Sequence, residues 1–121
     1  MTSLPPIDRD TALRLLEKQV QLAGSNYVYA AHDNVCQYVE GGQPDCLIAR
    51  ALVDYGVPVA VLKEWDSPTR EIRQAWEKFN PSFLTLAAVK VFAVAQDKQD
   101  EGQSWGYAVD AARNAMNMGL A

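Results

Sequence analysis

The chain has 121 residues, a formal net charge of -4 and an apolar fraction of 49%, which together are typical of one globular domain with a single core. The acidic balance argues against general electrostatic binding of nucleic acid, because that mode needs a basic face that displaces counterions. The longest apolar stretch, from Phe83 to Ala95, contains Lys90 and is too short to cross a bilayer. We predict no secretory leader, and we expect a cytoplasmic protein.

The first predicted element is a helix that follows an irregular lead at residues 1–6. Asp8 suits its N-cap, because the carboxylate can accept hydrogen bonds from the free amides of the first turn. Gly24 can end this helix. Apolar residues spaced by three and four give the helix one apolar face: Leu13, Leu16, Val20 and Ala23.

A small antiparallel hairpin is predicted between Tyr27 and Val39. Residues 27–29 and 35–39 are rich in β-branched and aromatic types, and the short polar stretch AHDN lies between them. Two strands alone are marginally stable in water, so we expect the hairpin to pack against helices. The stretch GGQPD is predicted to end the second strand.

Two helices are predicted directly after the hairpin. Pro44 and Asp45 suit the first turn of one of them, because proline needs no amide partner there and a carboxylate is favourable near the positive helix end. Gly56 can end this helix. A shorter helix is expected from Pro58 through Trp65.

Three further helices are predicted in the C-terminal half. Ser67 and Pro68 are typical of a cap followed by a first helical residue. The segment from Ser82 to about Asp100 is apolar almost all round and is predicted to be a buried central helix, with a strand at 89–94 as the alternative reading. Ser104 is the predicted cap of the last helix.

These elements predict one α+β domain over residues 1–121, mainly helical, in which five or six helices pack with one small antiparallel β-hairpin. The sequence contains no Gly-rich phosphate loop, nucleophile elbow or dinucleotide fingerprint. The sequence therefore favours a protein without catalytic activity or a cofactor, but it does not exclude an enzyme.

Both cysteines lie in the stretch CQYVEGGQPDC. In a cytoplasmic protein Cys36 and Cys46 stay reduced, and we expect both to pack as small apolar residues. Cys46 at a helix start could instead be a reactive thiolate, although the charge of Asp45 disfavours the thiolate form. A disulfide between the two cysteines, which would close a short loop, is another alternative. A metal site is the weakest alternative, because adding His32 gives a spacing that matches no standard zinc motif. A thiol- or metal-dependent activity at these cysteines is the first functional alternative.

A DNA-binding helix-turn-helix is the second alternative. The segment from Ala49 to Trp65 has a helix, a glycine turn and a second helix in the right order. The second helix is apolar, however, and Lys63 is its only basic residue, whereas a recognition helix needs donors for base edges and phosphates. Nucleic acid is therefore a disfavoured partner.

Two stretches, YVYAAHDNVCQYVEGGQPDCLIARALVDYGV and AQDKQDEGQSWGYAVDAA, resemble a group of small proteins of unknown function that are encoded by phages of actinobacteria and by related bacterial genomes. The shared patterns are C-x-Y-V, G-x-P-x-C-L and Q-D-x-G-x-x-W-G-x-A-V. The resemblance implies a cytoplasmic accessory protein and brings no catalytic residues. We therefore expect a non-enzymatic protein that binds and modulates a host or phage protein. The motif residues considered for binding are Tyr38, Gly42, Pro44, Cys46 and Trp105.

Overall fold

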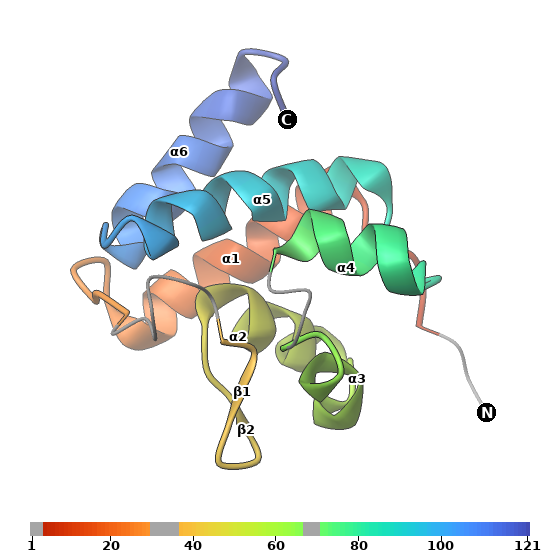
Figure 1. The fold of residues 1–121 in the computed structure, drawn as a ribbon. Coiled ribbons are helices and arrows are strands. Elements are labelled where there is room, and N and C mark those ends of the chain that lie inside the picture. The colour runs from red at the N-terminus through yellow and green to blue at the C-terminus, as the bar shows by residue number, and fades with distance from the viewer. Residues whose placement is uncertain (1–3, 30–36, 67–70) are drawn as a thin grey trace.

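Six helices and one two-stranded antiparallel sheet make up the part of the chain that the structure, a computed structural model, describes: residues 4–29, 37–66 and 71–121 (Figure 1). This confirms the mainly helical α+β fold with a small hairpin. None of these helices is long and apolar enough to span a membrane. In chain order the elements are α1 (Arg9–Ala23), β1 (Val39–Glu40), β2 (Gln43–Pro44), α2 (Leu47–Tyr55), α3 (Val59–Lys63), α4 (Ile72–Phe79), α5 (Leu86–Asp100) and α6 (Trp105–Asn117).

Helix α5 is the centre of the packing. It contacts α1, α2, α4 and α6, and Figure 1 shows it lying across the middle of the helices. Thr85 caps it by accepting a hydrogen bond from the Ala88 amide (3.1 Å). The predicted central helix is thus confirmed and the alternative strand is wrong, because α5 buries apolar residues on several of its sides. The buried apolar residues of α5 are Ala88, Val89, Val91, Phe92 and Ala95.

Two helices begin where the sequence predicts. Asp8 accepts a hydrogen bond from the Thr11 amide (2.7 Å) at the start of α1, and this bond lowers the pKa of the Asp8 carboxyl. Ser104 accepts one from the Tyr107 amide (3.2 Å) at the start of α6. Such caps are local, because the side chain and the amide are three residues apart.

Three other helices begin later than predicted, among them α5, which begins at Leu86 rather than Ser82. Helix α2 starts at Leu47, with Cys46 rather than Pro44 at its N-terminus. Helix α4 starts at Ile72, and the predicted cap residues Ser67 and Pro68 lie outside the described residues. Neither α2 nor α4 receives a cap from the side chain at its own N-terminus.

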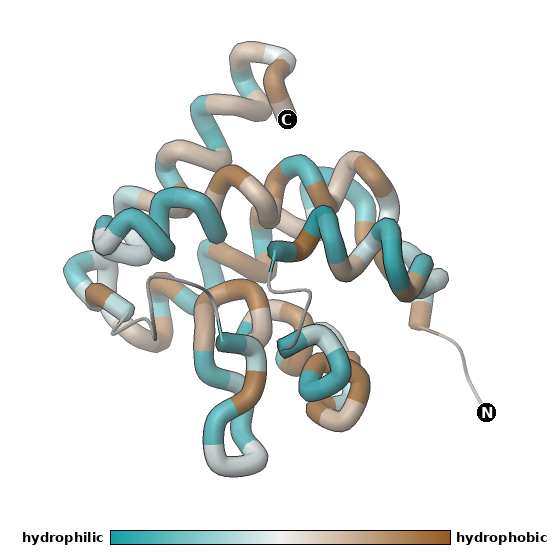
Figure 2. The backbone as a smooth tube through the Cα atoms, in the orientation of Figure 1, coloured by the Kyte–Doolittle hydropathy of each residue, from teal (hydrophilic) through white to brown (hydrophobic). Residues whose placement is uncertain are grey.

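The hairpin lies further along the chain than predicted. Strands β1 and β2 pair Val39 with Pro44 and Glu40 with Gln43. The glycine pair at 41–42 forms its tip, with positive φ angles of 57° and 78°. This is the backbone of a two-residue type I′ turn, whose twist matches that of the flanking strands. Glycine therefore makes the turn here, where the prediction had it end a strand; Figure 2 shows this tip as a hydrophilic to neutral loop.

The segment predicted as the first strand has another partner. Val28 forms an isolated antiparallel bridge with Ser104, at the start of α6. Residues 30–36, which include the predicted AHDN turn, lie outside the described residues. The stretch 25–28 therefore packs against the start of α6, and the prediction that Tyr27 to Val39 forms one hairpin is wrong for residues 27–29.

Candidate functional site

Three of the five motif residues lie in the core. Tyr38, Cys46 and Trp105 have no exposed surface. Gly42 is exposed at the hairpin tip, and Pro44 is half-buried on β2. The buried side chains support the fold, so a surface for a partner has to come from other residues.

The two stretches that carry the resemblance meet at Gln99 of α5. Its Oε1 accepts hydrogen bonds from the Leu47 amide (2.8 Å) and from the Trp105 indole Nε1 (3.1 Å). Gln99 is completely buried. This amide therefore caps α2 from a position 52 residues away and fixes the indole beside it.

Gln96 does the same for α4. Its Oε1 accepts a hydrogen bond from the Ile72 amide (2.8 Å), and its Nε2 donates one to the Tyr38 hydroxyl (3.0 Å). Burial raises the pKa of the Tyr38 phenol. No local sequence signal identifies Gln96 as a cap, because its partner lies 24 residues away.

Cys46 is disulfide-bonded. The expectation of a free, packed thiol is therefore wrong for this residue, although its burial is as predicted. The tight hairpin supplies the reason: the Cys46 amide donates to the Gln37 carbonyl (3.0 Å) and the Asp45 amide to the Tyr38 carbonyl (2.9 Å), which turns residue 46 back onto the preceding segment. A disulfide sulfur is not a thiolate nucleophile.

A metal centre finds no support in the residues that the structure describes. Among them, no three His, Cys, Asp or Glu side chains form a group that could hold a metal ion. His32 and Cys36 lie outside this part of the chain. The carboxylate of Asp45, the residue before Cys46, accepts a hydrogen bond from the Tyr29 hydroxyl (2.5 Å).

The DNA-binding alternative gains little from the structure of residues 49–65. Helices α2 and α3 follow each other as predicted, but α3 has only five residues and Lys63 is its one basic residue. A helix that reads base edges presents several polar side chains to the major groove. Helix α3 does not.

Exposed apolar and aromatic side chains occur where α1 ends and α6 begins. Val28 is 53% exposed and Tyr107 is 52% exposed. The Trp105 amide donates to the Tyr27 carbonyl (2.8 Å), and the Tyr27 and Trp105 rings meet edge to face at 4.5 Å. We call this surface the α1–α6 junction and define it by Leu22, Tyr27, Val28 and Arg50.

Arg50 of α2 joins the junction through its stacking. Its guanidinium carbon lies 5.1 Å from the centre of the Trp105 ring and 5.9 Å from that of the Tyr27 ring. Its Nε donates to the Asp45 carbonyl (3.0 Å). The stacking and this hydrogen bond hold the guanidinium in one place on the surface.

At Gly106 the start of α6 makes its closest approach to the stretch that follows α1. The Gly106 amide donates to the Ser25 carbonyl (3.0 Å), and a Cβ at position 106 would lie only 2.6 Å from that same oxygen. The amides of Trp105, Gly106 and Tyr107 at the start of α6 thus all have protein acceptors. The N-terminus of α6 has no free amide among these three for an anion.

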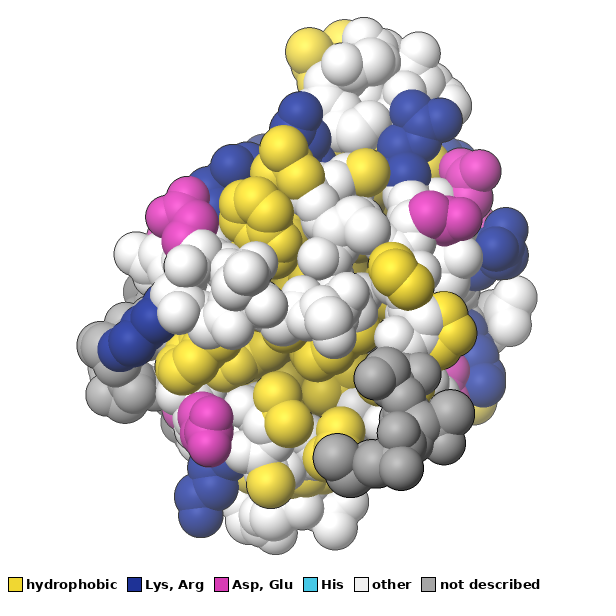
Figure 3. Space-filling model, turned by 90° about the vertical axis from the view of Figure 1, so that its right-hand side faces the viewer, with side chains coloured by type: hydrophobic (Ala, Val, Ile, Leu, Met, Phe, Trp, Pro, Cys, Tyr) yellow, Lys and Arg dark blue, Asp and Glu magenta, His cyan; other side chains and the backbone are white. Residues whose placement is uncertain are grey.

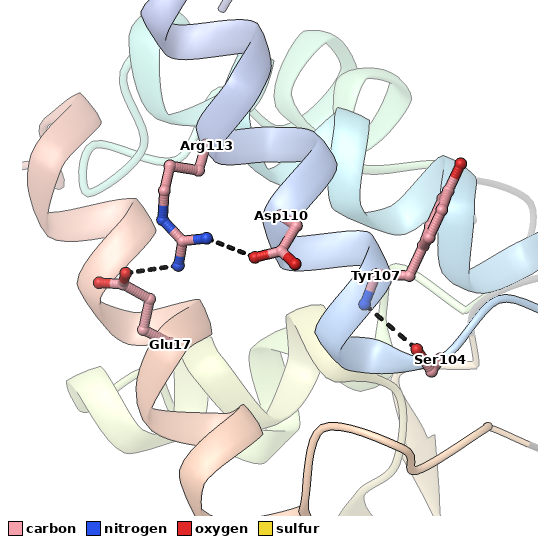
Figure 4. Close-up of polar contacts among 5 residues, drawn as sticks. All are labelled: Glu17, Ser104, Tyr107, Asp110 and Arg113. Atoms are coloured by element: carbon pink, nitrogen blue, oxygen red, sulfur yellow. Dashed lines mark hydrogen bonds and ion pairs between the residues drawn. The ribbon is translucent and has the colours of Figure 1, made fainter.

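A groove of about 360 Å³ runs beside the junction between α1 and α6. Arg113 bridges its walls: the guanidinium donates to Glu17 of α1 (2.7 Å) and to Asp110, and these hydrogen bonds raise the pKa of Arg113. Figure 4 shows this bridge on the α1 side of α6, while Tyr107 points away from α1. The charges in the groove are already paired with each other.

Apolar side chains are also exposed on a different side of the molecule. Figure 3 shows them gathered across the middle of a face, with charged side chains around them. That face is the right-hand side of Figure 1, whereas the end of α1 lies at the left.

Comparison with known proteins adds no relative: no family model, no curated protein and no solved structure matches the chain.

Proposed function

We propose that this chain is a non-enzymatic binding protein that engages another protein through the α1–α6 junction and thereby modulates it. The observation that carries the proposal is the exposure of tyrosine and valine side chains beside a stacked arginine. Tyrosine and arginine are enriched where protein interfaces hold most of their binding energy. The resemblance noted in the sequence directs the search to a protein of an actinobacterial host or of its phage.

The rigidity of the junction supports this choice of surface. The stretch 25–28 is tied to α6 by two backbone hydrogen bonds and by the bridge between Val28 and Ser104. Tyr27 packs on the buried Trp105 ring. A surface held in this way loses little conformational entropy when a partner binds.

The test is a tagged pull-down from an actinobacterial lysate, half of it treated with nuclease, with partners identified by mass spectrometry. We expect one nuclease-resistant partner in near-stoichiometric yield. Val28→Asp should weaken its capture by about tenfold or more, because it places an unpaired charge in the apolar part of the interface. Leu86→Ala is the control, because Leu86 is 42% exposed at the first residue of α5, away from the junction.

The remaining outcomes separate the alternatives. A partner that the two variants capture equally well would show that another surface binds. Partners that disappear with nuclease would favour the DNA-binding alternative.

A further inference from the structure

A pocket of about 370 Å³ lies between α1, β2 and α2, next to the α1–α6 junction. It opens widely to solvent. Its polar lining includes Gln19, Arg50 and Asp54, and its apolar lining is Leu22, Pro44 and Val53. Leu22 and Arg50 also belong to the junction, so the pocket is continuous with the surface proposed for binding.

Gln19 is the first sign that this pocket takes a ligand. The residue is only 5% exposed, yet its side-chain amide has no hydrogen-bond partner in the described chain, unlike the amides of Gln96 and Gln99. Among the described residues no buried side-chain nitrogen or oxygen lacks a partner, so this amide reaches solvent at the wall of the pocket. Because Gln19 lines the pocket, a molecule seated there can hydrogen-bond with it.

Arg50 is the second sign. Its Nε is used by the Asp45 carbonyl, and stacking on Tyr27 and Trp105 fixes the plane of its guanidinium. The two terminal nitrogens make no ion pair or hydrogen bond with the residues that the structure describes. Two parallel N–H groups in a fixed plane match the two oxygens of a carboxylate.

The unpaired charge of the pocket has the sign that a carboxylate needs. Asp54 is the one acidic residue of its lining, and Lys18 forms an ion pair with it at 3.0 Å. The lining itself has one cation and one anion, and Lys18 compensates the charge of Asp54 from outside it. The guanidinium of Arg50 has no ion pair among the described residues, and it therefore favours an acidic ligand.

We propose that this pocket binds the carboxylate of an aspartate or glutamate side chain that a partner protein presents next to an aliphatic residue. The carboxylate accepts from the terminal nitrogens of Arg50 and from Nε2 of Gln19, and the aliphatic neighbour packs on Leu22 and Val53. A widely open pocket suits a protruding side chain better than a small molecule, which needs enclosure. This inference rests on the proposed function and names the chemistry of the partner.

The test is a titration of ¹⁵N-labelled protein followed by NMR. The probe is the peptide acetyl-Ala-Leu-Glu-Leu-Ala-amide, and the matched neutral probe has Gln in place of Glu. We expect the Glu peptide to shift the signals of the Arg50 Nε–H and the Gln19 side-chain amide, and the Gln peptide to leave both in place. Equal shifts with both peptides, or none with either, would overturn the proposal.

Three variants sharpen the titration. Arg50→Gln should weaken the binding of the Glu peptide by about tenfold or more, because a charged hydrogen bond is lost. If Arg50→Gln does not fold, Gln19→Glu answers the same question, because it keeps the side-chain shape and repels the carboxylate. Arg9→Gln is the control, since it removes one arginine from the exposed start of α1. A loss as large in Arg9→Gln as in Arg50→Gln would reduce the effect to net charge and overturn the site.

Two further arms separate the source of the carboxylate and the two proposals. Propionate that binds as tightly as the Glu peptide would overturn the claim that a protein segment is the ligand. If the peptide binds but wild-type protein captures no partner, the site stands and the proposed function fails. If a partner is captured equally by wild type and by Arg50→Gln, the function stands and the carboxylate site fails.

Discussion

At the scale of single residues, the absence of a Cβ at Gly106 lets α6 pack closely against the backbone of Ser25. Gly106 is the only glycine within a described helix, and it has no Cβ at the point where α6 meets the Ser25 backbone. Elsewhere in a helix, replacing glycine by alanine raises stability, because glycine has more backbone freedom to lose. Here the close approach reverses that sign.

We predict that Gly106→Ala lowers the free energy of unfolding by about 1–3 kcal/mol, as overpacking does. Urea denaturation measures this change. Asn114→Ala, at an exposed position of the same helix, is the control and should stay within about 0.5 kcal/mol of wild type. A Gly106→Ala protein that is more stable than wild type would contradict the predicted contact.

Cys46 gives the second prediction at this scale. After denaturation without reductant, iodoacetamide should label no thiol on the protein, because Cys46 is disulfide-bonded and the chain has only one other cysteine. Cys46→Ala should lower the free energy of unfolding by about 2–4 kcal/mol. A reductant should lower the stability of wild type and leave that of the variant unchanged. Labelling of both cysteines would restore the reduced, packed thiols that the sequence suggested.

At the scale of elements, α5 organises the helices that lie around it. Gln96 and Gln99 are one turn apart on α5, and they accept hydrogen bonds from the first amides of α4 and α2 respectively. A helix end that is buried needs such acceptors. One helix thereby fixes where two others begin.

We predict that Gln99→Leu lowers the free energy of unfolding by about 1–3 kcal/mol, because it leaves the Leu47 amide and the Trp105 indole buried without an acceptor. Gln74→Leu, at an exposed position of α4, is the control. Thermal unfolding followed by far-ultraviolet circular dichroism measures both variants. Equal melting temperatures for Gln99→Leu and wild type would show that water replaces the lost acceptor.

At the scale of the whole molecule, buried phenols link stability to alkaline pH. Burial raises the pKa of Tyr38, and burial followed by the hydrogen bond to Asp45 raises that of Tyr29. The unfolded chain releases these protons near pH 10, whereas the folded protein keeps them. Stability is therefore complete below about pH 10 and is lost as the pH rises above that value.

The expected result is a urea midpoint that falls between about pH 9 and pH 11, a window set by the unfolded pKa. Tyr38→Phe should make this fall shallower, whatever its effect on stability at neutral pH. The slope against pH is the relevant readout, because the variant also loses the hydrogen bond with Gln96. A midpoint that stays constant over this range would show that the two phenols titrate alike in the folded and unfolded chains.

The disulfide also bears on where the protein works. Disulfides persist in oxidising compartments and are rare in the cytoplasm. A bond at Cys46 that persists in cells would indicate an oxidising compartment, and reduced thiols there would fit the cytoplasmic prediction. The labelling experiment described for Cys46, repeated on protein trapped with acid directly in cells, measures the redox state that applies there.

Local chemistry was readable from the sequence alone. The caps at Asp8 and Ser104 are correct because donor and acceptor are three residues apart, and the class of the fold follows from apolar periodicity. The central helix, predicted from Ser82 to about Asp100, is correct as an element although it begins at Leu86, because a long segment that is apolar almost all round is typical of a buried helix.

Only the tertiary structure decided what depends on distant parts of the chain. The hairpin forms around the two-residue turn at 41–42. Val28 instead pairs with Ser104, 76 positions further on. The starts of α2 and α4 depend on two glutamines of α5. Arg50 and Gln19 line the same pocket because α1 packs against α2. Sequence spacing does not determine these contacts, because each of them joins segments that are far apart in the chain.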